Sequence, residues 1–141
     1  MRMKYVAMVA LACALIVSLM ACSGTHSASD DPLDGTSWTL MAYRKTRPIP
    51  GTTITATFED GQVHGSAGCN SYSGSYQISD DTITVDEIAI TEMACLEPEG
   101  TMDQEVKFIE FIQDAQTFRF ADAQLQIFRS DGEALTFVPQ D

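Results

Sequence analysis

The feature that most constrains the fold is a series of short segments in which apolar and polar residues alternate, with turn residues between them. Residues 53–58 show it most clearly, because Ile54, Ala56 and Phe58 alternate with threonines. Successive side chains of a strand point to opposite faces, so this alternation predicts a half-buried strand. The same pattern predicts strands over residues 36–43, 53–58, 62–67, 70–79, 82–91, 117–121, 124–129 and 134–138.

About eight short strands joined by short turns predict a mainly β fold, an antiparallel sheet curled into a small barrel. One of the strands has an irregular pattern. Its apolar residues shift from odd positions, Ile83 and Val85, to even positions, Ile88 and Ile90. A β-bulge at residues 86–87 would keep both halves facing the core, and we predict one there.

Residues 102–114 have the pattern of one amphipathic helix that packs against the barrel or closes one end of it. Thr101 and Gln104 have the spacing of a capping box, in which each side chain bonds to the backbone of the first turn. Asp103 and Glu105 would lie in that turn, where the helix dipole favours acidic side chains. The predicted apolar face consists of Val106, Phe108, Ile109, Phe111 and Ile112.

The first residues have the organisation of a bacterial lipoprotein leader. Arg2 and Lys4 precede an apolar run over residues 5–20, which ends in Met20, Ala21 and Cys22. We therefore predict a lipoprotein signal peptide over residues 1–21, with Cys22 as the lipidated N-terminus. An uncleaved anchor helix and an ordinary secretory signal are the alternatives. The small polar residues that follow predict a flexible tether over 22–34 and a folded domain over 35–141.

The cysteines outside the leader suggest a disulfide. With Cys22 assigned to the lipid, Cys69 and Cys95 are the pair left, in an oxidising compartment. A bridge over this loop would stabilise the fold by roughly 3.5 kcal/mol in the chain-entropy model. The alternative is a redox-active pair, which usually needs the closer spacing of C-x-x-C. We find no histidine spacing that would make the cysteines a zinc site, and we predict no metal and no cofactor.

The charge of the chain limits its partners. Its formal net charge is −12, which opposes binding to the phosphate backbone of nucleic acids. Arg44, Lys45 and Arg47 hold half of the basic side chains outside the leader. They could contact anionic lipid or an acidic partner, or they could simply form a solvated loop.

The chain resembles the META domain family, whose members include the HslJ-like bacterial lipoproteins. The resemblance begins at residues 35–40 and continues through two short motifs around the cysteines, residues 68–76 and 91–95. It ends in the helix and in the hairpin of residues 125–137. Its residues are Trp38, Gly65, Gly68, Cys69, Asn70, Tyr72, Gly74, Tyr76, Thr91, Met93, Ala94, Cys95, Glu105, Phe108, Leu125 and residues 135–137.

The resemblance implies a small antiparallel β fold with one helix, a location in the cell envelope and a link to stress or drug tolerance. It implies no catalytic residues, because the family has no established reaction. Each motif residue also has a structural interpretation: glycines permit tight turns, Asn70 can bond to its own backbone, and the tyrosines bury their rings with the hydroxyl groups near water. The alternative is a recognition surface beside the disulfide, built on Asn70, Tyr72 and Glu92.

Three functions are compatible with these observations. The first is a non-catalytic, lipid-anchored envelope protein that is monomeric and binds a protein partner under stress. If the host has two membranes, we expect it on the periplasmic face of the outer membrane. Inhibition of a secreted hydrolase is one form of this function. The second is a carrier of a small molecule or lipid inside the barrel. The third is an enzyme, which the sequence disfavours, because neither His26 nor His64 has a nucleophile at a recognisable spacing.

Overall fold

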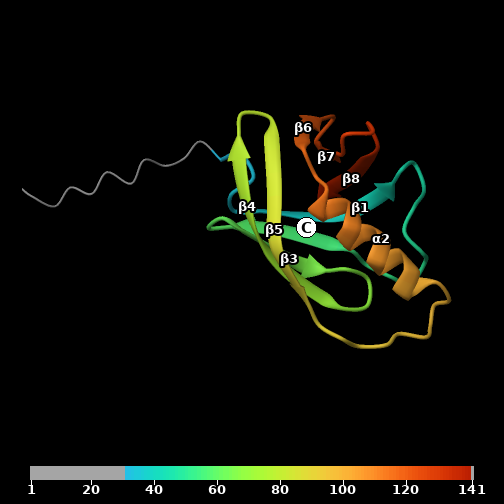
Figure 1. Cartoon of the computed structure of the whole chain (residues 1–141). Coiled ribbons are helices and arrows are strands. Elements are labelled where there is room, and N and C mark those ends of the chain that lie inside the picture. The colour runs from blue at the N-terminus through green and yellow to red at the C-terminus, as the bar shows by residue number, and fades with distance from the viewer. Residues whose placement is uncertain (1–30, 141) are drawn as a thin grey trace, which may run out of the picture. The chain divides into compact units, whose positions relative to one another are not determined.

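The computed structural model describes residues 31–140, which form a closed barrel of eight antiparallel strands with one helix (Figure 1). Each strand pairs with its neighbours in the chain, and β1 pairs with β8 to close the barrel. The predicted fold is confirmed, and all eight predicted strands are present. They are β1 (Thr36–Tyr43), β2 (Thr55–Glu59), β3 (Gln62–Ser66), β4 (Ser71–Ser79), β5 (Thr82–Ile90), β6 (Thr117–Ala121), β7 (Gln124–Phe128) and β8 (Ala134–Pro139).

The weakest seam of the barrel lies between β5 and β6, which pair at a single position, Thr82 with Thr117. Helix α2 (Thr101–Gln113) connects these two strands in the chain and packs beside β5 (Figure 1). The helix buries Phe108, Phe111 and Ile112 among the side chains of the barrel. It therefore supplies apolar surface at the place where strand pairing is thinnest.

Side chains fill the interior of the barrel. Fully buried rings come from two strands, as Phe58 and Phe137, and from the helix, as Phe108 and Phe111. Two tyrosines of β4 pack edge-to-face on this cluster, Tyr76 on Phe58 and Tyr72 on Phe108, with ring centroids 5.0 and 5.4 Å apart. Burying each large apolar side chain contributes roughly 1.5–3 kcal/mol. Because these rings occupy the centre, the predicted alternative of a carrier with its ligand inside the barrel is not favoured.

The predicted bulge is present in β5. The register with β4 runs from Ser73 opposite Ala89 to Ser75 opposite Asp86, so two residues of β5 face Gly74. One of them, Glu87, has a φ of 55°. The bulge turns Ile88 toward the core, but Ile90, the last residue of β5, is 38% exposed. The expectation that both halves of the strand face the core is thus correct only up to Ile88.

The helix differs from its prediction at its start and on one face. Gly100 is the N-cap, with a φ of 86°, and no side chain caps the helix. The hydroxyl of Thr101 instead donates to the backbone carbonyl of Pro98, so the predicted capping box is wrong. Val106 is 54% exposed rather than in the core, because the buried stripe runs through residues 101, 105, 108, 111 and 112.

The N-terminal edge of the domain lies earlier than predicted. Leu33, placed by the sequence at the end of the tether, is fully buried in the core. The backbone N–H of Leu33 donates to the carboxylate of Asp31, and its carbonyl accepts from the N–H of Thr36. A single apolar residue among polar ones has no periodicity, so the sequence contained no signal for it. The predicted signal peptide, the lipidation site Cys22 and most of the tether lie outside the described residues.

Candidate functional site

Asn70 lies at the centre of a buried hydrogen-bond network that joins three segments of the chain. Its side-chain amide donates to the carbonyl of Met93 at 3.0 Å and to the carboxylate of Glu105 at 2.8 Å. Its side-chain oxygen accepts from the hydroxyl of Thr91 at 2.8 Å and from the N–H of Met93 at 2.7 Å. The amide thus uses all four of its hydrogen-bonding positions. We call these four residues, Asn70, Thr91, Met93 and Glu105, the Asn70 clasp.

Glu105 brings the helix into the clasp. Its carboxylate accepts from the backbone N–H groups of Asn70, at 2.6 Å, and of Cys69, at 3.3 Å, and its side chain is almost fully buried. Hydrogen bonds to a charged acceptor are stronger than those between neutral groups and compensate for burying the carboxylate. From the sequence, we expected Glu105 to interact with the helix dipole. That expectation did not include its main contacts, the hydrogen bonds to residues 69 and 70. Its position three residues before Phe108, on the buried stripe, was the available signal.

The predicted disulfide is present and lies beside the clasp. Cys69 and Cys95 are bonded to each other, with their Cα atoms 5.9 Å apart. The bridge ties the β3–β4 connection to residues 91–100, which lead from β5 to α2. The clasp and the disulfide therefore hold the same two segments together, one by polar contacts and one by a covalent bond.

The tyrosines of the motif have buried rings and make partly buried hydrogen bonds through their hydroxyl groups. The hydroxyl of Tyr72 donates to the carbonyl of Thr55 at 2.9 Å, and that of Tyr76 donates to the carboxylate of Asp31 at 2.6 Å. Burial raises the pKa of both hydroxyl groups, and for Tyr76 the hydrogen bond and negative charge of Asp31 raise the pKa further. Both rings are buried as expected, and each hydroxyl group bonds to a protein acceptor.

Two motif glycines are required by close backbone contact. A Cβ at Gly65 would lie 2.2 Å from the carbonyl oxygen of Thr55 on the neighbouring strand. A Cβ at Gly74 would lie 2.9 Å from the carbonyl oxygen of Asp86, on the inner side of the bulge. Both distances are shorter than non-bonded atoms tolerate, so any larger residue would separate the strands.

The other motif residues divide between the interior and the surface. Trp38 is buried in β1, and Gly68 has a φ of 113° at the turn before the disulfide. Ala94 is exposed in the connection to the helix. Of the predicted recognition surface, Asn70 and Tyr72 are buried and Glu92 is exposed. Asn70 and Tyr72 therefore offer little surface to a partner.

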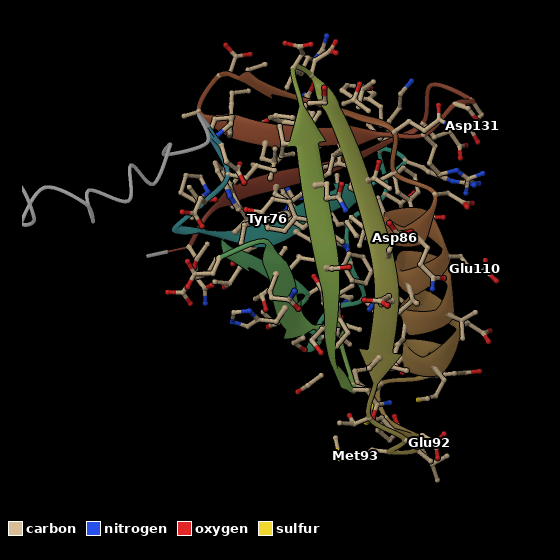
Figure 2. The ribbon with its side chains drawn as sticks, turned by 60° about the vertical axis from the view of Figure 1, so that its left-hand side comes forward. Tyr76, Asp86, Glu92, Met93, Glu110 and Asp131 are labelled. Atoms are coloured by element: carbon tan, nitrogen blue, oxygen red, sulfur yellow. A yellow bond between two sulfur atoms is a disulfide. The ribbon has the colours of Figure 1, made fainter. Side chains whose placement is uncertain are left out.

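The connection that carries Glu92 exposes a group of apolar and acidic side chains. Met93 is 57% exposed and Leu96 is 83% exposed. Glu92, Glu97 and Glu99, which are close to them in sequence, are also exposed. Figure 2 places Glu92 and Met93 beyond the end of β5, at the end of the domain away from Asp131. We call these five exposed side chains the Met93 surface; it was not predicted, because Met93 and Leu96 follow no periodic pattern.

Residues 31–140 contain no group of three or more histidine, cysteine, aspartate or glutamate side chains placed to hold a metal ion. Within this part of the chain, no helix has both the length and the apolar character needed to cross a membrane.

Comparison with known families agrees with this geometry. The model of the META domain family matches residues 31–141, a span that holds the barrel, the clasp and the disulfide. The chain belongs to the META domain family. A search of curated proteins found no match.

Solved structures show the same fold. An NMR structure of a protein from Burkholderia xenovorans is 27% identical, with a TM-score of 0.63, and the match covers 77% of this chain and 83% of that one. A second NMR structure is 21% identical, with a TM-score of 0.62 and coverage of 76% and 91%. A crystal structure of a DUF4847 family protein from Bacteroides vulgatus is 17% identical, with a TM-score of 0.55 and coverage of 79% and 99%. These chains consist mostly or wholly of the matched domain, so a domain of this fold folds on its own.

Proposed function

We propose that this META domain protein is a non-catalytic, lipid-anchored envelope protein that binds a protein partner through the Met93 surface. The observation that supports this most is the combination of an exposed side chain and a fixed backbone at Met93. Its N–H and carbonyl both bond to the buried Asn70, while its side chain is 57% exposed. Because its backbone is already fixed, binding would cost only the freedom of the side chain itself.

The chemistry of the Met93 surface defines the partner. Met93 and Leu96 offer apolar area, and methionine is enriched at protein interfaces. Three exposed glutamates lie in the same segment, so complementary charge would come from lysine or arginine on the partner. We therefore propose a partner with a basic surface around an apolar pocket. If that partner is a secreted hydrolase whose activity falls on binding, the protein is its inhibitor.

The lipid anchor is part of this proposal. The leader pattern ending in Ala21 and Cys22 supports it, together with the envelope location that the family resemblance implies. A lipidated cysteine would hold the domain near a membrane, where it would support envelope integrity or assembly under stress. Replacing Cys22 with serine in the full chain should move the protein from the membrane fraction to the soluble fraction. Unchanged membrane retention would contradict the anchor without affecting the Met93 surface.

The Met93 surface is tested with residues 31–141 immobilised through a C-terminal tag. The wild-type domain and the Met93→Ser/Leu96→Ser variant are incubated with an envelope extract of the host, and bound proteins are identified by mass spectrometry. The matched control is Val106→Ser, which removes an exposed apolar side chain from helix α2. We expect a basic protein, released by salt, that the wild type and the control retain and the double variant loses.

The candidate is then purified and titrated. Its affinity should fall at least tenfold for the double variant and should change less than twofold for Val106→Ser. Equal binding by all three domains, or a partner with an acidic surface, would refute the proposed function.

A further inference from the structure

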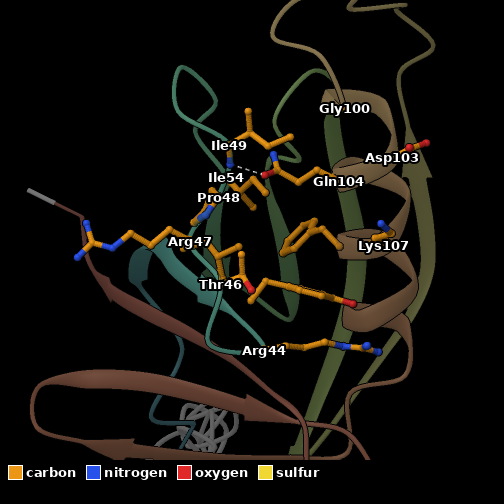
Figure 3. Close-up of a pocket in the computed structure, with 13 residues that line it drawn as sticks. Arg44, Thr46, Arg47, Pro48, Ile49, Ile54, Gly100, Asp103, Gln104 and Lys107 are labelled. Atoms are coloured by element: carbon orange, nitrogen blue, oxygen red, sulfur yellow. Dashed lines mark hydrogen bonds between the residues drawn. The ribbon is translucent and has the colours of Figure 1, made fainter.

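A pocket of about 420 Å³ lies between helix α2 and residues 44–54, the connection from β1 to β2 (Figure 3). Leu40, Ile54 and Phe108 form its floor and belong to the buried core. Tyr43 and Ile49 add apolar surface to its walls. This volume lies within the range of small-molecule sites, and an apolar floor is typical of them.

The wall formed by the β1–β2 connection is fastened to the helix. Gln104 accepts the backbone N–H of Ile49 at 2.7 Å and donates to the hydroxyl of Thr52 at 2.9 Å (Figure 3 shows the first bond). The absence of a side chain at Gly100 lets Ile49 approach the start of the helix, since a Cβ there would lie 3.3 Å from the Cδ1 of Ile49. Specific contacts thus fix the position of this wall against the helix.

The rim of the pocket is positive on a protein that is otherwise acidic. Arg44, Arg47 and Lys107 line it, three of the eight basic residues in a chain with a net charge of −12. Asp103 is the one acidic residue among them. Arg44 forms an ion pair with Glu133, whereas no ion pair is found for Arg47 or Lys107 within residues 31–140.

Arg47 and Lys107 come from opposite walls of the pocket, the connection and the helix. Both side chains are exposed, and in Figure 3 the guanidinium of Arg47 extends away from the helix. Long exposed side chains change rotamer within nanoseconds, so Arg47 can turn toward a bound anion. Together the two cations can hold one anionic group at the mouth, above the apolar floor.

We infer that this pocket binds an amphipathic anion, a molecule with one carboxylate or phosphate group and an apolar chain or ring. The apolar part would cover Leu40, Ile54 and Phe108, and the anionic group would lie between Arg47 and Lys107. This site is separate from the proposed function, because none of its floor or rim residues belongs to the Met93 surface. It assigns a ligand to Arg47, for which the sequence left open an anionic lipid, an acidic partner or a solvated loop.

Dodecanoate is a suitable probe, titrated below its micelle concentration into isotopically labelled residues 31–141. NMR shifts should saturate at the amides of Ile49, Gln104 and Phe108 with one-to-one stoichiometry. Acetate, which has the charge without the chain, and dodecyltrimethylammonium, which has the chain with the opposite charge, should bind at least tenfold more weakly. Equal binding of dodecyltrimethylammonium, or no saturating shifts at these amides, would overturn the inference.

Variants test the rim. Arg47→Ser and Lys107→Ser should each weaken dodecanoate binding about threefold to tenfold. The matched control is Arg119→Ser, which removes the same charge from β6, outside the pocket. Equal weakening by the control would show a general charge effect and would also overturn the inference.

A parallel titration with phosphatidylcholine vesicles, with and without phosphatidylglycerol, identifies the source of the anion. Binding to the phosphatidylglycerol vesicles that Lys107→Ser weakens would identify a membrane lipid as the ligand. Binding of dodecanoate without vesicle binding would identify a free amphipathic carboxylate.

Discussion

The two faces of helix α2 differ in the burial of their polar residues. On one face Glu105 is buried and bonds to the turn at Cys69 and Asn70. On the other face Gln104 and Lys107 line a pocket that is open to solvent. One helix therefore closes the barrel with one side and forms the wall of a pocket with the other.

Comparing the two faces distinguishes residues whose hydrogen bonds maintain the fold from exposed residues that are available to a ligand. In the clasp, every hydrogen-bonding position of Asn70 is used within the protein, so none is available to a ligand. At the pocket, Arg47 and Lys107 are exposed above an apolar floor. Most residues of the family motif thus build the scaffold, whereas Met93 belongs to the motif and is also exposed.

Removing the clasp should have the largest effect. Asn70→Ala would leave the backbone of Met93 and part of the Glu105 carboxylate without partners, and a buried charge that loses a partner costs several kcal/mol. We expect the free energy of unfolding to fall by about 4 kcal/mol in urea titrations. The control, Ser73→Ala on the same strand, should change it by less than about 0.5 kcal/mol. A loss below about 1 kcal/mol for Asn70→Ala would mean that the two faces do not differ as described.

Removing the disulfide should have the next largest effect. Cys69→Ser/Cys95→Ser frees a loop of 26 residues in sequence separation, which costs about 3.5 kcal/mol in the chain-entropy model. Urea unfolding of the oxidised wild type and of the double variant measures this difference. If these two segments stay close together in the unfolded chain without the disulfide, the measured loss would be much smaller than the model gives.

The buried tyrosines predict a loss of stability at alkaline pH. Burial raises the pKa of Tyr72 and Tyr76 in the folded protein, so the unfolded chain loses its phenolic protons at a lower pH. Stability from this source is fully present below about pH 10 and falls as the pH rises above it, by about 1 kcal/mol for Tyr72 at pH 11 and by less for Tyr76.

Thermal unfolding between pH 8 and pH 11 would show this fall. Tyr72→Phe and Tyr76→Phe should each be less stable at pH 8, because each loses a hydrogen bond, and should each show a shallower decline. An equally steep decline in both variants would assign the alkaline loss to other groups.

The smallest effect is expected on the pocket side. Gln104→Ala removes two partly buried hydrogen bonds between the helix and the β1–β2 connection, which together contribute about 1 kcal/mol. Hydrogen exchange at the amide of Ile49 should become much faster, whereas exchange at the amide of Asn70 should not change. Faster exchange at both amides would show that the two faces are coupled.

Much of the architecture could be read from local patterns. The alternation in residues 53–58 predicted β2, and the shift of phase after Val85 predicted the bulge at Glu87. The cysteine arithmetic predicted the disulfide. Each of these inferences uses residues that are close in sequence or few in number, which is why the sequence was sufficient.

The candidate sites were less accessible to the same reasoning. Glu105 and Asn70 are 35 positions apart, and no local pattern indicates that the glutamate accepts the backbone N–H of the asparagine. Gln104 fits a capping box by spacing, yet its side chain bonds to Ile49 and Thr52. In both cases a tertiary partner outcompeted the local one.

The sequence by itself determined the strands, the helix and the cysteine pair, because hydrophobic periodicity and residue chemistry are local properties of the chain. Only the tertiary structure decided which polar side chains are buried and which apolar ones are exposed. Asn70 and Glu105 are buried because each satisfies the other, and Met93 is exposed because its backbone is held at the end of the barrel. The positive rim of the pocket forms for the same reason, since closing the barrel brings Arg47 and Lys107 to opposite walls of one cavity.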